Sequence, residues 1–489
     1  MPIALLVFFA AAATALPARP ITGPWPEAYP AKDLCSNCGL CNTAVGVEHV
    51  ADACAFLGDG NSRIEQLEPA VHGRGRSFSQ GHLSEAHFGV HQRIVLARGT
   101  QRDAQWTGVA TGVALALLEA GHVDAVIVTG SDSSGSFAAP KPVLCRTTDD
   151  VLQGRRVKPS LSPALQVLEE VKADRGIRKL LFCGVGCAVQ ALRGVGSARG
   201  ESPEEALGLE PGGLYVLGTH CVDNSPTPQA AANFISELPS IGASRAAAVT
   251  AYEFMADFKV HARVREEGEQ EEVTIKQAYM TLPPSIGIPS IADSCYSCFD
   301  YTNGLADLVV GYMGAPFDAG DEMQTAPLMV TVRNARGAAM LDAAVAASRV
   351  SVLVEGGHGG AALPSSGDRT ELAMQTARRD SLVQSLTEPE FAPADQGAPP
   401  WLGNILAWII ARGLPKGLEF GRYSIDYHFL RNAIFVERRM GEVQAKRHTP
   451  EYARAIMERY GVKLDELRAQ AAEVARDGGF SGTGGSKGK

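Results

Sequence analysis

The sequence lacks the runs of basic residues that proteins use to bind nucleic acids. Its 489 residues carry a formal net charge of -9, and no stretch gathers Lys and Arg into a basic stripe. Because phosphate backbones attract basic surfaces, this balance argues against nucleic acid as a partner. A small acidic protein partner is still compatible with the charge, provided that the fold gathers a local basic face.

The sequence also lacks an apolar run that is long enough to span a membrane. Apolar residues 3–16 end in small residues, a pattern typical of a signal-peptide core and its cleavage region, although no basic residue precedes them. We therefore interpret residues 1–20 as a signal or targeting segment, with an ordinary buried segment as the alternative. The longest later run, residues 401–410, has the length of a buried or amphipathic helix.

A disulfide framework is not expected, although the chain contains 10 cysteines. Such frameworks belong to small secreted domains that cannot build a sufficient core. This chain is 45% hydrophobic and is long enough for more than one core. If the leader directs the chain to a reducing plastid stroma, free thiolates and metal clusters are allowed.

From residue 88 onward, helical and strand patterns alternate. A Gly/Thr turn after residue 105 precedes a predicted helix that ends at Gly121 and a buried strand over residues 123–129. The theme repeats with a helix over residues 163–173 and a strand over residues 179–184, followed by a strand over residues 214–217. This alternation predicts an α/β core with a mixed sheet.

The rest of the chain has other patterns. Residues 252–276 alternate apolar and polar side chains around a charged turn, which predicts an antiparallel pair of strands, and an apolar strand follows Asp307. Residues 355–400 have the Gly, Ala, Pro and acidic composition of a long loop or linker. From residue 401 the pattern is mostly helical, and the Gly-rich end of the chain is expected to be disordered.

Four cysteines near the N-terminus are spaced like the ligands of an iron-sulfur cluster. Cys35, Cys38 and Cys41 are each separated by two residues, and Cys54 follows. Three thiolates at this spacing suit three corners of a [4Fe-4S] cluster, whereas a zinc site normally pairs two hooks of two ligands. We predict an iron-sulfur cluster, with zinc or disulfides as alternatives and with Asp52 as an alternative to Cys54.

A second set of cysteines is more widely dispersed. Cys295 and Cys298 form another hook, while Cys187 and Cys221 each follow a predicted strand. Loops at one end of an α/β sheet can converge, so these four thiolates could hold a second cluster, in which an Asp or His could replace one cysteine. Cys145 and Cys183 are interpreted as small buried apolar residues.

Dispersed stretches of the chain resemble the family of the deazaflavin-reducing hydrogenase β subunit. They include DACAFLGDGNSRIEQLEPAVHGRGR, QWTGVATGVAL, RVKPSLSP, LLFCGVGCAVQALR, LYVLGTHCVDN, SCYSCFDYTNGLADLVVGYMGAP and PKGLEFGRYSIDYHFLRN. They occur in order between about residues 26 and 460. The resemblance is strongest to the plant and algal branch that reduces the 7-hydroxymethyl group of a chlorophyll. GYMGAPF instead looks like the sister branch that reduces the 8-vinyl group of divinyl chlorophyllide, and His220 departs from both.

The resemblance implies FAD and two [4Fe-4S] clusters as cofactors. It also implies reduced ferredoxin as the electron donor, a chlorophyll-type tetrapyrrole as the acceptor, a location in the chloroplast stroma, and a homo-oligomer such as a trimer. Hydrogenase members of the family imply a different alternative, an electron-transfer subunit that binds no pigment. Because ferredoxin delivers single electrons while the reduction needs two, a flavin suits the task.

For the flavin, the matched motifs indicate Trp106, Thr107, Gly108 and Thr111. A glycine in this turn lets the backbone approach a pyrophosphate, and the N-terminus of the following helix attracts anions; an ordinary helix cap is the alternative. Further candidates for flavin contact lie in RVKPSLSP: Lys158, Ser160 and Ser162. No catalytic acid is assigned from the candidates His87, His91, Tyr252, Asp257 and Tyr296.

The predicted organisation has seven parts. They are a signal or targeting segment (1–20), an N-terminal iron-sulfur segment (21–84), a flavin-binding α/β domain (85–174), a second α/β domain with cluster ligands (175–350), a linker (351–400), a helical C-terminal region (401–475) and a disordered tail (476–489).

Overall fold

The computed structural model describes most of the chain. The described residues are 34–78, 83–101, 103–131, 139–317, 321–355, 365–366, 369–387 and 395–459, with single helical positions at 466, 469, 472, 473 and 476. The predicted signal segment over residues 1–20 lies outside them, and so does all of the predicted tail after residue 476.

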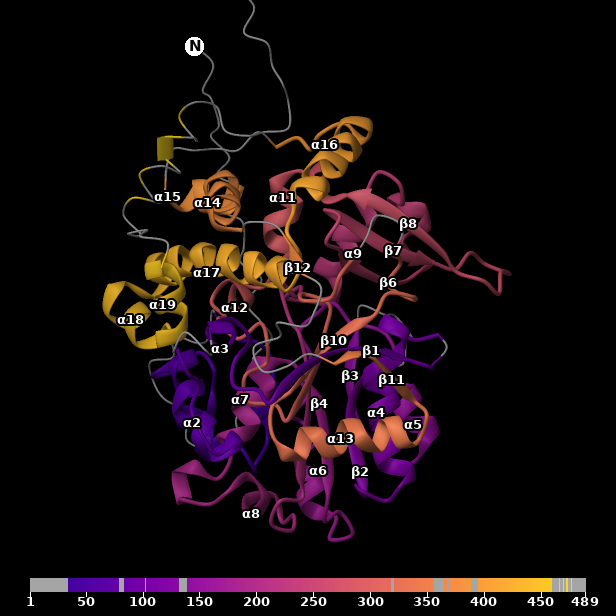
Figure 1. The fold of residues 1–489 in the computed structure, drawn as a ribbon, viewed down its shortest axis with the longest axis vertical. Helices are drawn as coiled ribbons and strands as arrows, with labels where there is room; N and C mark the ends of the chain where they lie inside the picture. The colour runs from indigo at the N-terminus through magenta and orange to yellow at the C-terminus, as the bar shows by residue number, and fades with distance from the viewer. Residues whose placement is uncertain are drawn as a thin grey trace, which may run out of the picture.

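An eight-stranded mixed sheet forms the centre of the fold (Figure 1). Its strands follow the order β11-β1-β10-β9-β5-β4-β2-β3; the pairs β2/β4, β4/β5 and β5/β9 are parallel and the others are antiparallel. The strands are β1 (Arg93–Gly99), β2 (Ala125–Ser131), β3 (Pro140–Cys145), β4 (Leu180–Gly184), β5 (Leu214–Thr219), β9 (Leu308–Gly311), β10 (Leu328–Val332) and β11 (Val350–Glu355). The predicted mixed-sheet α/β fold is confirmed.

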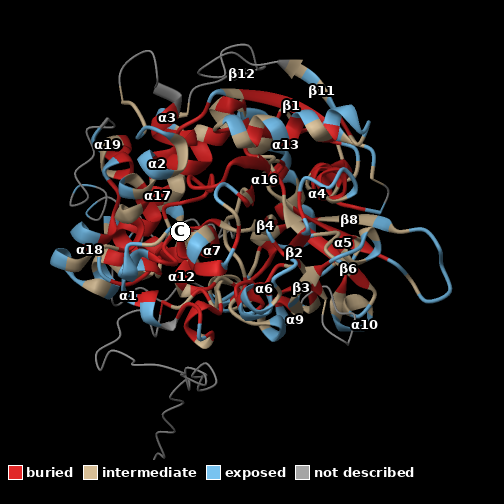
Figure 2. Cartoon of the chain, turned by 90° about the horizontal axis from the view of Figure 1, so that it is seen from below, coloured by how far each residue is buried: buried red, intermediate tan, exposed pale blue. Residues whose placement is uncertain are grey.

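Helices cover both faces of this sheet, which is why its strands are mostly apolar. Successive side chains on β1 illustrate this: Ile94 packs into one core, and Val95 packs into the other. The first core includes side chains from α6 (Leu168–Ala173), α7 (Gly186–Arg193) and α17 (Leu418–Met440); the second includes α4 (Val109–Glu119) and α13 (Ala335–Ala346). Figure 2 shows buried residues along the central strands.

A smaller antiparallel sheet lies beside the large one and contains β6 (Val249–Phe254), β7 (Lys259–Val264) and β8 (Val273–Ala278). The predicted pair is present, since β7 and β8 are joined by the charged turn over residues 265–272. The sheet has a third strand, β6, because Tyr252 pairs with Ala262 and extends the pattern.

The remaining elements are short. They are η2 (Leu40–Asn42), η3 (Val47–His49), α1 (Val50–Ala53), η4 (Gly60–Ser62), α2 (Arg63–His72), α3 (Leu83–Phe88), η6 (Trp106–Gly108), α5 (Thr148–Leu152), η7 (Ser197–Arg199), α8 (Pro203–Leu207), α9 (Pro228–Ser236), α10 (Gly242–Ala246), η8 (Tyr279–Thr281), α11 (Pro284–Gly287), η9 (Ile288–Ser290), α12 (Asp293–Tyr296), β12 (Ser365–Ser366) and β13 (Lys416–Gly417). The helix predicted over residues 163–173 begins only at Leu168, after a turn.

The C-terminal part is helical, as predicted, with α16 (Pro400–Gly413), α17, α18 (Glu442–His448) and α19 (Glu451–Arg459). The linker predicted over residues 351–400 is wrong in part, because α14 (Thr370–Arg379) and α15 (Ser381–Thr387) lie within it. Ala373 and Ala377 of α14 are fully buried, so this segment forms an amphipathic helix between Gly- and Pro-rich stretches that dominate the composition. Within the described residues, no helix is both long and apolar enough to cross a membrane.

Candidate active site

A cavity of about 1400 Å³ lies at the carboxyl ends of the parallel strands. The loops after β4, β5 and β9 contribute to its wall, and so do β6, α14 and α17. Ligands of α/β sheets bind at this edge. Typical pockets for one small ligand measure roughly 300–1,000 Å³, so this cavity has room for a cofactor and a substrate together.

The first thiol set consists of Cys35, Cys38, Cys41 and Cys54, whose thiols lie near enough to influence one another's pKa. Positive φ angles at Asn37 (55°) and Gly39 (89°) turn the loop. Burial, followed by the neighbouring thiols of Cys54, Cys35 and Cys187, raises the pKa of Cys38.

Cys54 stands with the other members of this set. Burial raises its pKa to about 12, and the thiols of Cys35 and Cys41 add to the shift. Asp52, the alternative ligand, has an exposed side chain. The arrangement therefore favours Cys54 as the fourth member.

The second thiol set consists of Cys187, Cys221, Cys295 and Cys298, from three separate segments of the chain: the start of α7, the loop after β5, and α12 with the residues that follow it. Burial, then the thiols of Cys295 and Cys187, raises the pKa of Cys221. Burial and the thiol of Cys187 also head the causes that raise the pKa of Cys298. The four thiols thus interact electrostatically with one another. That they hold a second cluster stays a prediction.

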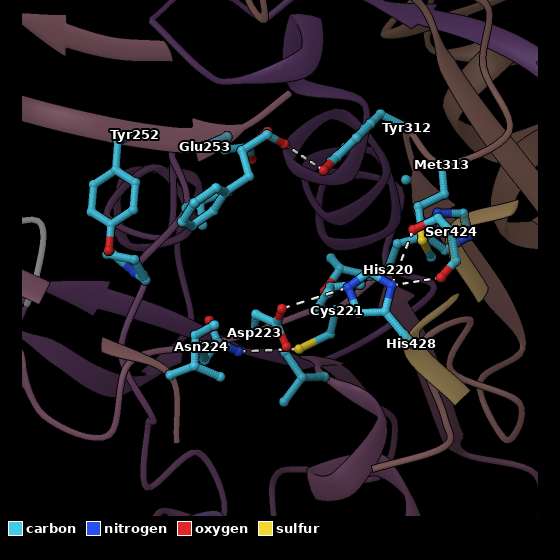
Figure 3. Close-up of a pocket in the computed structure, with 18 of the residues that line it drawn as sticks. His220, Cys221, Asp223, Asn224, Tyr252, Glu253, Tyr312, Met313, Ser424 and His428 are labelled. Atoms are coloured by element: carbon cyan, nitrogen blue, oxygen red, sulfur yellow. Dashed lines mark hydrogen bonds and ion pairs between the residues drawn. The ribbon is translucent and has the colours of Figure 1, made fainter. Parts of the chain in front are cut away.

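Nitrogen donors approach sulfur atoms in both sets. The backbone N–H of Asn37 donates to Cys35 Sγ at 3.3 Å, and that of Asp300 donates to Cys298 Sγ at 3.3 Å. The side-chain amide of Asn224 donates to Cys221 Sγ at 3.1 Å (Figure 3). Hydrogen bonds to sulfur stabilise thiolates and tune iron-sulfur clusters, so these donors fit such a group.

The two thiol sets adjoin each other and the cavity. The hydroxyl of Ser36 hydrogen-bonds the Cys187 thiol, and Cys38 interacts electrostatically with Cys187. Cys38, Cys187 and Cys221 all line the cavity wall. A short path therefore connects the first set, the second set and the cavity.

The described residues contain no disulfide. All ten cysteines lie in the described ranges, and each is a free thiol. In the same ranges, no three His, Cys, Asp or Glu side chains meet closely enough to hold a single metal ion.

The turn before α4 carries the residues predicted to bind a flavin. Trp106, Thr107 and Gly108 have positive φ angles of 52°, 57° and 73°. Gly108 is the N-cap of α4, and no described side chain caps the helix there. The uncapped backbone N–H groups of this helix N-terminus can donate hydrogen bonds to an anion.

Trp106, Gly108 and Thr111 line the cavity, but Thr107 does not. The Thr107 hydroxyl instead accepts a hydrogen bond from the Gly99 N–H at 2.7 Å and fixes the turn against β1. The position of Thr107 therefore does not support the predicted flavin contact, because its hydroxyl is hydrogen-bonded to the backbone.

The loop after α5 adds cationic and polar groups to the wall. Lys158, Ser160 and Ser162 line the cavity together with Arg156, and their contact with a flavin stays a prediction. Burial, together with the charges of Arg156 and Arg155, lowers the pKa of Lys158 to about 8. The buried Ser162 Oγ has no hydrogen-bond partner within the described part of the chain.

Glu253 on β6 is an acid that the sequence analysis missed. Its carboxylate oxygen accepts a hydrogen bond from Trp106 Nε1 at 2.6 Å, and both residues line the cavity. The Trp106 ring also stacks on Tyr312, with centroids 4.9 Å apart. Burial raises the pKa of Glu253 to about 8, against the effect of the Trp106 hydrogen bond. The signal for it was the stretch YEFMADFKV, from which the sequence analysis took Tyr252 and Asp257 as candidate acids but not Glu253.

Helix α17 places a second ionisable group at the wall (Figure 3). His428 Nδ1 lies 2.5 Å from the backbone oxygen of Ser424, and its Nε2 lies 3.5 Å from Asp223. Arg431 binds both Asp223 oxygens, at 2.9 and 2.7 Å. Burial by itself would raise the pKa of Asp223, but the interactions with Arg431 and His428 lower it. The ion pair between Arg431 and Asp223 anchors the loop that carries Cys221.

His220 lies between the sheet and the cavity. Its ring occupies the space beside Gly311, where a Cβ atom would come within 2.0 Å of the imidazole. Neither ring nitrogen has a hydrogen-bond partner among the residues that the structure describes. Burial and the charge of Arg333 lower the pKa of His220 to about 3, so the ring is neutral.

Only two of the five candidate acids from the sequence lie at the cavity. Tyr252 and Tyr296 line it. His87 pairs with Asp426 at 2.8 Å, His91 lies 2.8 Å from the Gly89 oxygen, and Asp257 pairs with His261 at 2.9 Å; these three are outside the wall. Cys183 also lines the cavity, unlike the buried Cys145.

Two adjoining thiol sets beside one large cavity define a redox protein that suits iron-sulfur and flavin-type cofactors. Comparison with known protein families shows to which family of redox proteins the chain belongs. Residues 94–169 match the N-terminal model of the coenzyme F420 hydrogenase/dehydrogenase beta subunit, and residues 177–353 match its C-terminal model. The chain belongs to this family and is an oxidoreductase.

Individual relatives cover most of the chain. It is 46% identical over 434 residues to the 7-hydroxymethyl chlorophyll a reductase, chloroplastic, of Oryza sativa subsp. japonica, a match that covers 88% of this chain and 83% of that protein. It is 38% identical over 447 residues to an uncharacterized protein of Nostoc sp., covering 89% and 95%. The F420-reducing [NiFe] hydrogenase complex of Methanosarcina barkeri contains a chain with 23% identity and a TM-score of 0.44, covering 55% of this chain and 84% of that one.

Proposed function

We propose that the protein is a ferredoxin-dependent iron-sulfur flavoprotein of the chloroplast stroma that reduces the 7-hydroxymethyl group of a chlorophyll to a methyl group. The observation that carries the proposal is the presence of both thiol sets at one cavity that is large enough for two ligands. The similarity to the rice reductase along 88% of the chain supports the choice of substrate.

The reaction converts R–CH2OH, two electrons and two protons into R–CH3 and water. Ferredoxin supplies the electrons singly, and a bound flavin would store them as a pair. The first protein task is therefore to carry electrons to the cavity. We assign the first thiol set (Cys35, Cys38, Cys41 and Cys54) and the second thiol set (Cys187, Cys221, Cys295 and Cys298) to one [4Fe-4S] cluster each.

The second task is to hold FAD. The N-terminus of α4, with Gly108 and Thr111, offers N–H groups to the pyrophosphate, and Lys158 and Arg156 add positive charge. Ser162, whose hydroxyl lacks a partner among the described residues, supplies a further polar contact.

The third task is to deliver a proton, because a hydroxyl group leaves as water only when it is protonated. Glu253 suits this role: it lines the cavity, and its raised pKa of about 8 keeps the carboxyl group protonated near neutral pH. The Trp106 hydrogen bond orients the carboxyl group. We propose that Glu253 donates the proton to the departing oxygen.

A second candidate function is reduction of the 8-vinyl group of divinyl chlorophyllide. GYMGAPF resembles the branch with that activity, and its residues Gly311, Tyr312 and Met313 line the cavity. A third candidate, from the hydrogenase members, is an electron-transfer subunit that binds no pigment. These functions differ in what must occupy the large cavity.

Anaerobic assays with purified protein and reduced ferredoxin distinguish the three candidates. Incubation with 7-hydroxymethyl chlorophyll a is expected to give the methyl product. Formation of the 8-ethyl product from divinyl chlorophyllide would favour the second candidate, and failure to reduce either pigment would favour the third. Iron and sulfide analysis tests the clusters, since about four iron atoms per chain instead of eight would reject the second one.

The expected assembly is a homo-oligomer, with a trimer as the specific proposal. Light scattering of the purified protein tests it, and a monomer mass would reject it. Import of the full chain into isolated chloroplasts, followed by fractionation, tests the proposed stromal location.

A further inference from the structure

Helix α16 presents an apolar face to solvent. Trp401, Ile405, Trp408 and Ile409 are 67%, 47%, 51% and 54% exposed. Their spacing of four, three and one residues places them on one side of the helix. Because Trp and Ile are rarely exposed together, this patch points to an interaction. We call these four residues the outer face of α16.

The opposite side of the same helix packs on the protein and reaches the cavity. Ala407 is fully buried, and a Cβ atom on Gly403 would come within 2.5 Å of Thr281. Leu406 and Ile410 line the cavity. α16 thus contributes to the cavity wall, and it lies at one end of the molecule (Figure 1).

Between Asp395 and Glu419, the sequence that contains α16 has only basic charged residues. The chain has a net charge of -9, yet residues 396–418 contain Arg412 and Lys416 and no acidic residue. The Arg412 guanidinium stacks 3.8 Å from the Trp408 ring centroid. A basic group at the rim of a Trp-containing apolar face complements an anionic lipid surface.

The size of the outer face distinguishes a membrane from a protein partner. A stable protein interface buries about 1,200–2,000 Å² and uses about 20–30 residues on each side, whereas this face offers four apolar side chains on one helix. Insertion into a bilayer interface needs only such a helix, and Trp side chains favour that region.

We propose that the outer face of α16 docks on the surface of a lipid bilayer that contains anionic lipid. Docking would place the lipid against α16, the helix whose inner side contributes Leu406 and Ile410 to the cavity wall. If the proposed function holds, this docking gives a lipid-soluble pigment a route to the cavity. The docking itself needs no pigment, and it is measured without one.

Vesicle flotation of the holoprotein tests the docking. The double variant Trp401→Gln/Trp408→Gln is compared with the parent and with Val443→Gln, a control that removes an apolar side chain with 80% exposure on α18. All three proteins share the N-terminal apolar segment, so differences between them arise elsewhere. Vesicles contain phosphatidylcholine alone or with phosphatidylglycerol.

We expect the parent to float with the mixed vesicles, and the double variant to bind at least about tenfold more weakly. Val443→Gln should bind like the parent, and added salt should weaken binding. Iron and flavin contents should be unchanged, and so should reduction of detergent-dispersed pigment, because the outer face is separate from the cavity wall.

Three results would overturn the docking proposal: no binding by the parent, equal loss in both variants, or a double variant that binds normally. If the double variant instead changes the oligomeric mass in light scattering and leaves vesicle binding intact, the face contacts a second copy. Failure to reduce any pigment rejects the proposed function and leaves the vesicle result unaffected.

Discussion

Glu253→Gln gives a direct test of the proton donor. The glutamine keeps the size of the side chain, and its amide oxygen can still accept the Trp106 hydrogen bond. What the variant loses is the titratable proton. With a pKa of about 8, Glu253 is about nine-tenths protonated at pH 7, whereas a glutamic acid with the ordinary pKa of 4.5 would be less than about 1% protonated.

The expected effect on the rate follows from the role of a general acid, which contributes about 10²–10⁴-fold. Glu253→Gln should therefore lower kcat for pigment reduction by about that factor and should leave flavin and iron contents unchanged. In the parent, the active form is the protonated acid, so kcat should stay level below pH 8 and fall as the pH rises through about 8. The variant should lose this dependence.

Two measurements check these expectations. Anaerobic kcat is measured between pH 6 and pH 9, and infrared difference spectra follow the protonated carboxyl band over the same range. Glu266→Gln is the matched control, because Glu266 pairs with Arg245 at the surface and its loss should change neither profile. The reasoning is refuted if Glu253→Gln keeps the parent pH profile, whatever its kcat, or if no carboxyl band disappears near pH 8.

Other predictions concern the thiol sets and the flavin. Cys54→Ser should lower the iron content by up to about four atoms per chain while Asp52→Asn leaves it unchanged; the reverse pattern in iron analysis would identify Asp52 as the ligand. Arg431→Met should lower the free energy of unfolding by up to about 3–5 kcal/mol, since it removes both guanidinium contacts and leaves Asp223 with only His428, at 3.5 Å, as a partner. Thermal and urea denaturation measure this loss, and a change under about 1 kcal/mol would contradict the anchoring role. Lys158→Met should weaken FAD binding by about tenfold through loss of one charge near the pyrophosphate; flavin release on dilution measures it, and equal release from the parent would contradict the contact.

Local spacing made much of the site predictable. The intervals between Cys35, Cys38 and Cys41 reflect one tight loop, so sequence alone indicates that their thiols converge. Cys187 and Cys221 were predictable for a different reason: each follows a strand of the same sheet, and parallel strands end at one edge. The turn at Gly108 likewise carries its own local signal.

Residues that depend on tertiary packing were not predictable. Glu253 belongs to a separate antiparallel sheet, and only the packing of that sheet against the α4 turn brings its carboxyl group to Trp106. For Thr107 the local motif was misleading. Its position in the motif suggested contact with a ligand, but in the structure its hydroxyl accepts a hydrogen bond from the Gly99 N–H. α14 was missed because its burial is created by α17, which lies far along the chain.

The position of α17 in the cavity wall has a consequence for how such a protein diversifies. The family match ends at residue 353, yet His428 and Tyr423 of α17, with Leu372 of α14 and Leu406 of α16, complete the wall beyond it. The second thiol set and the α4 turn lie within the matched segments. Exchange of the C-terminal helices between relatives could therefore give an inherited electron-carrying core a new acceptor molecule, as a chimeric chain would reveal.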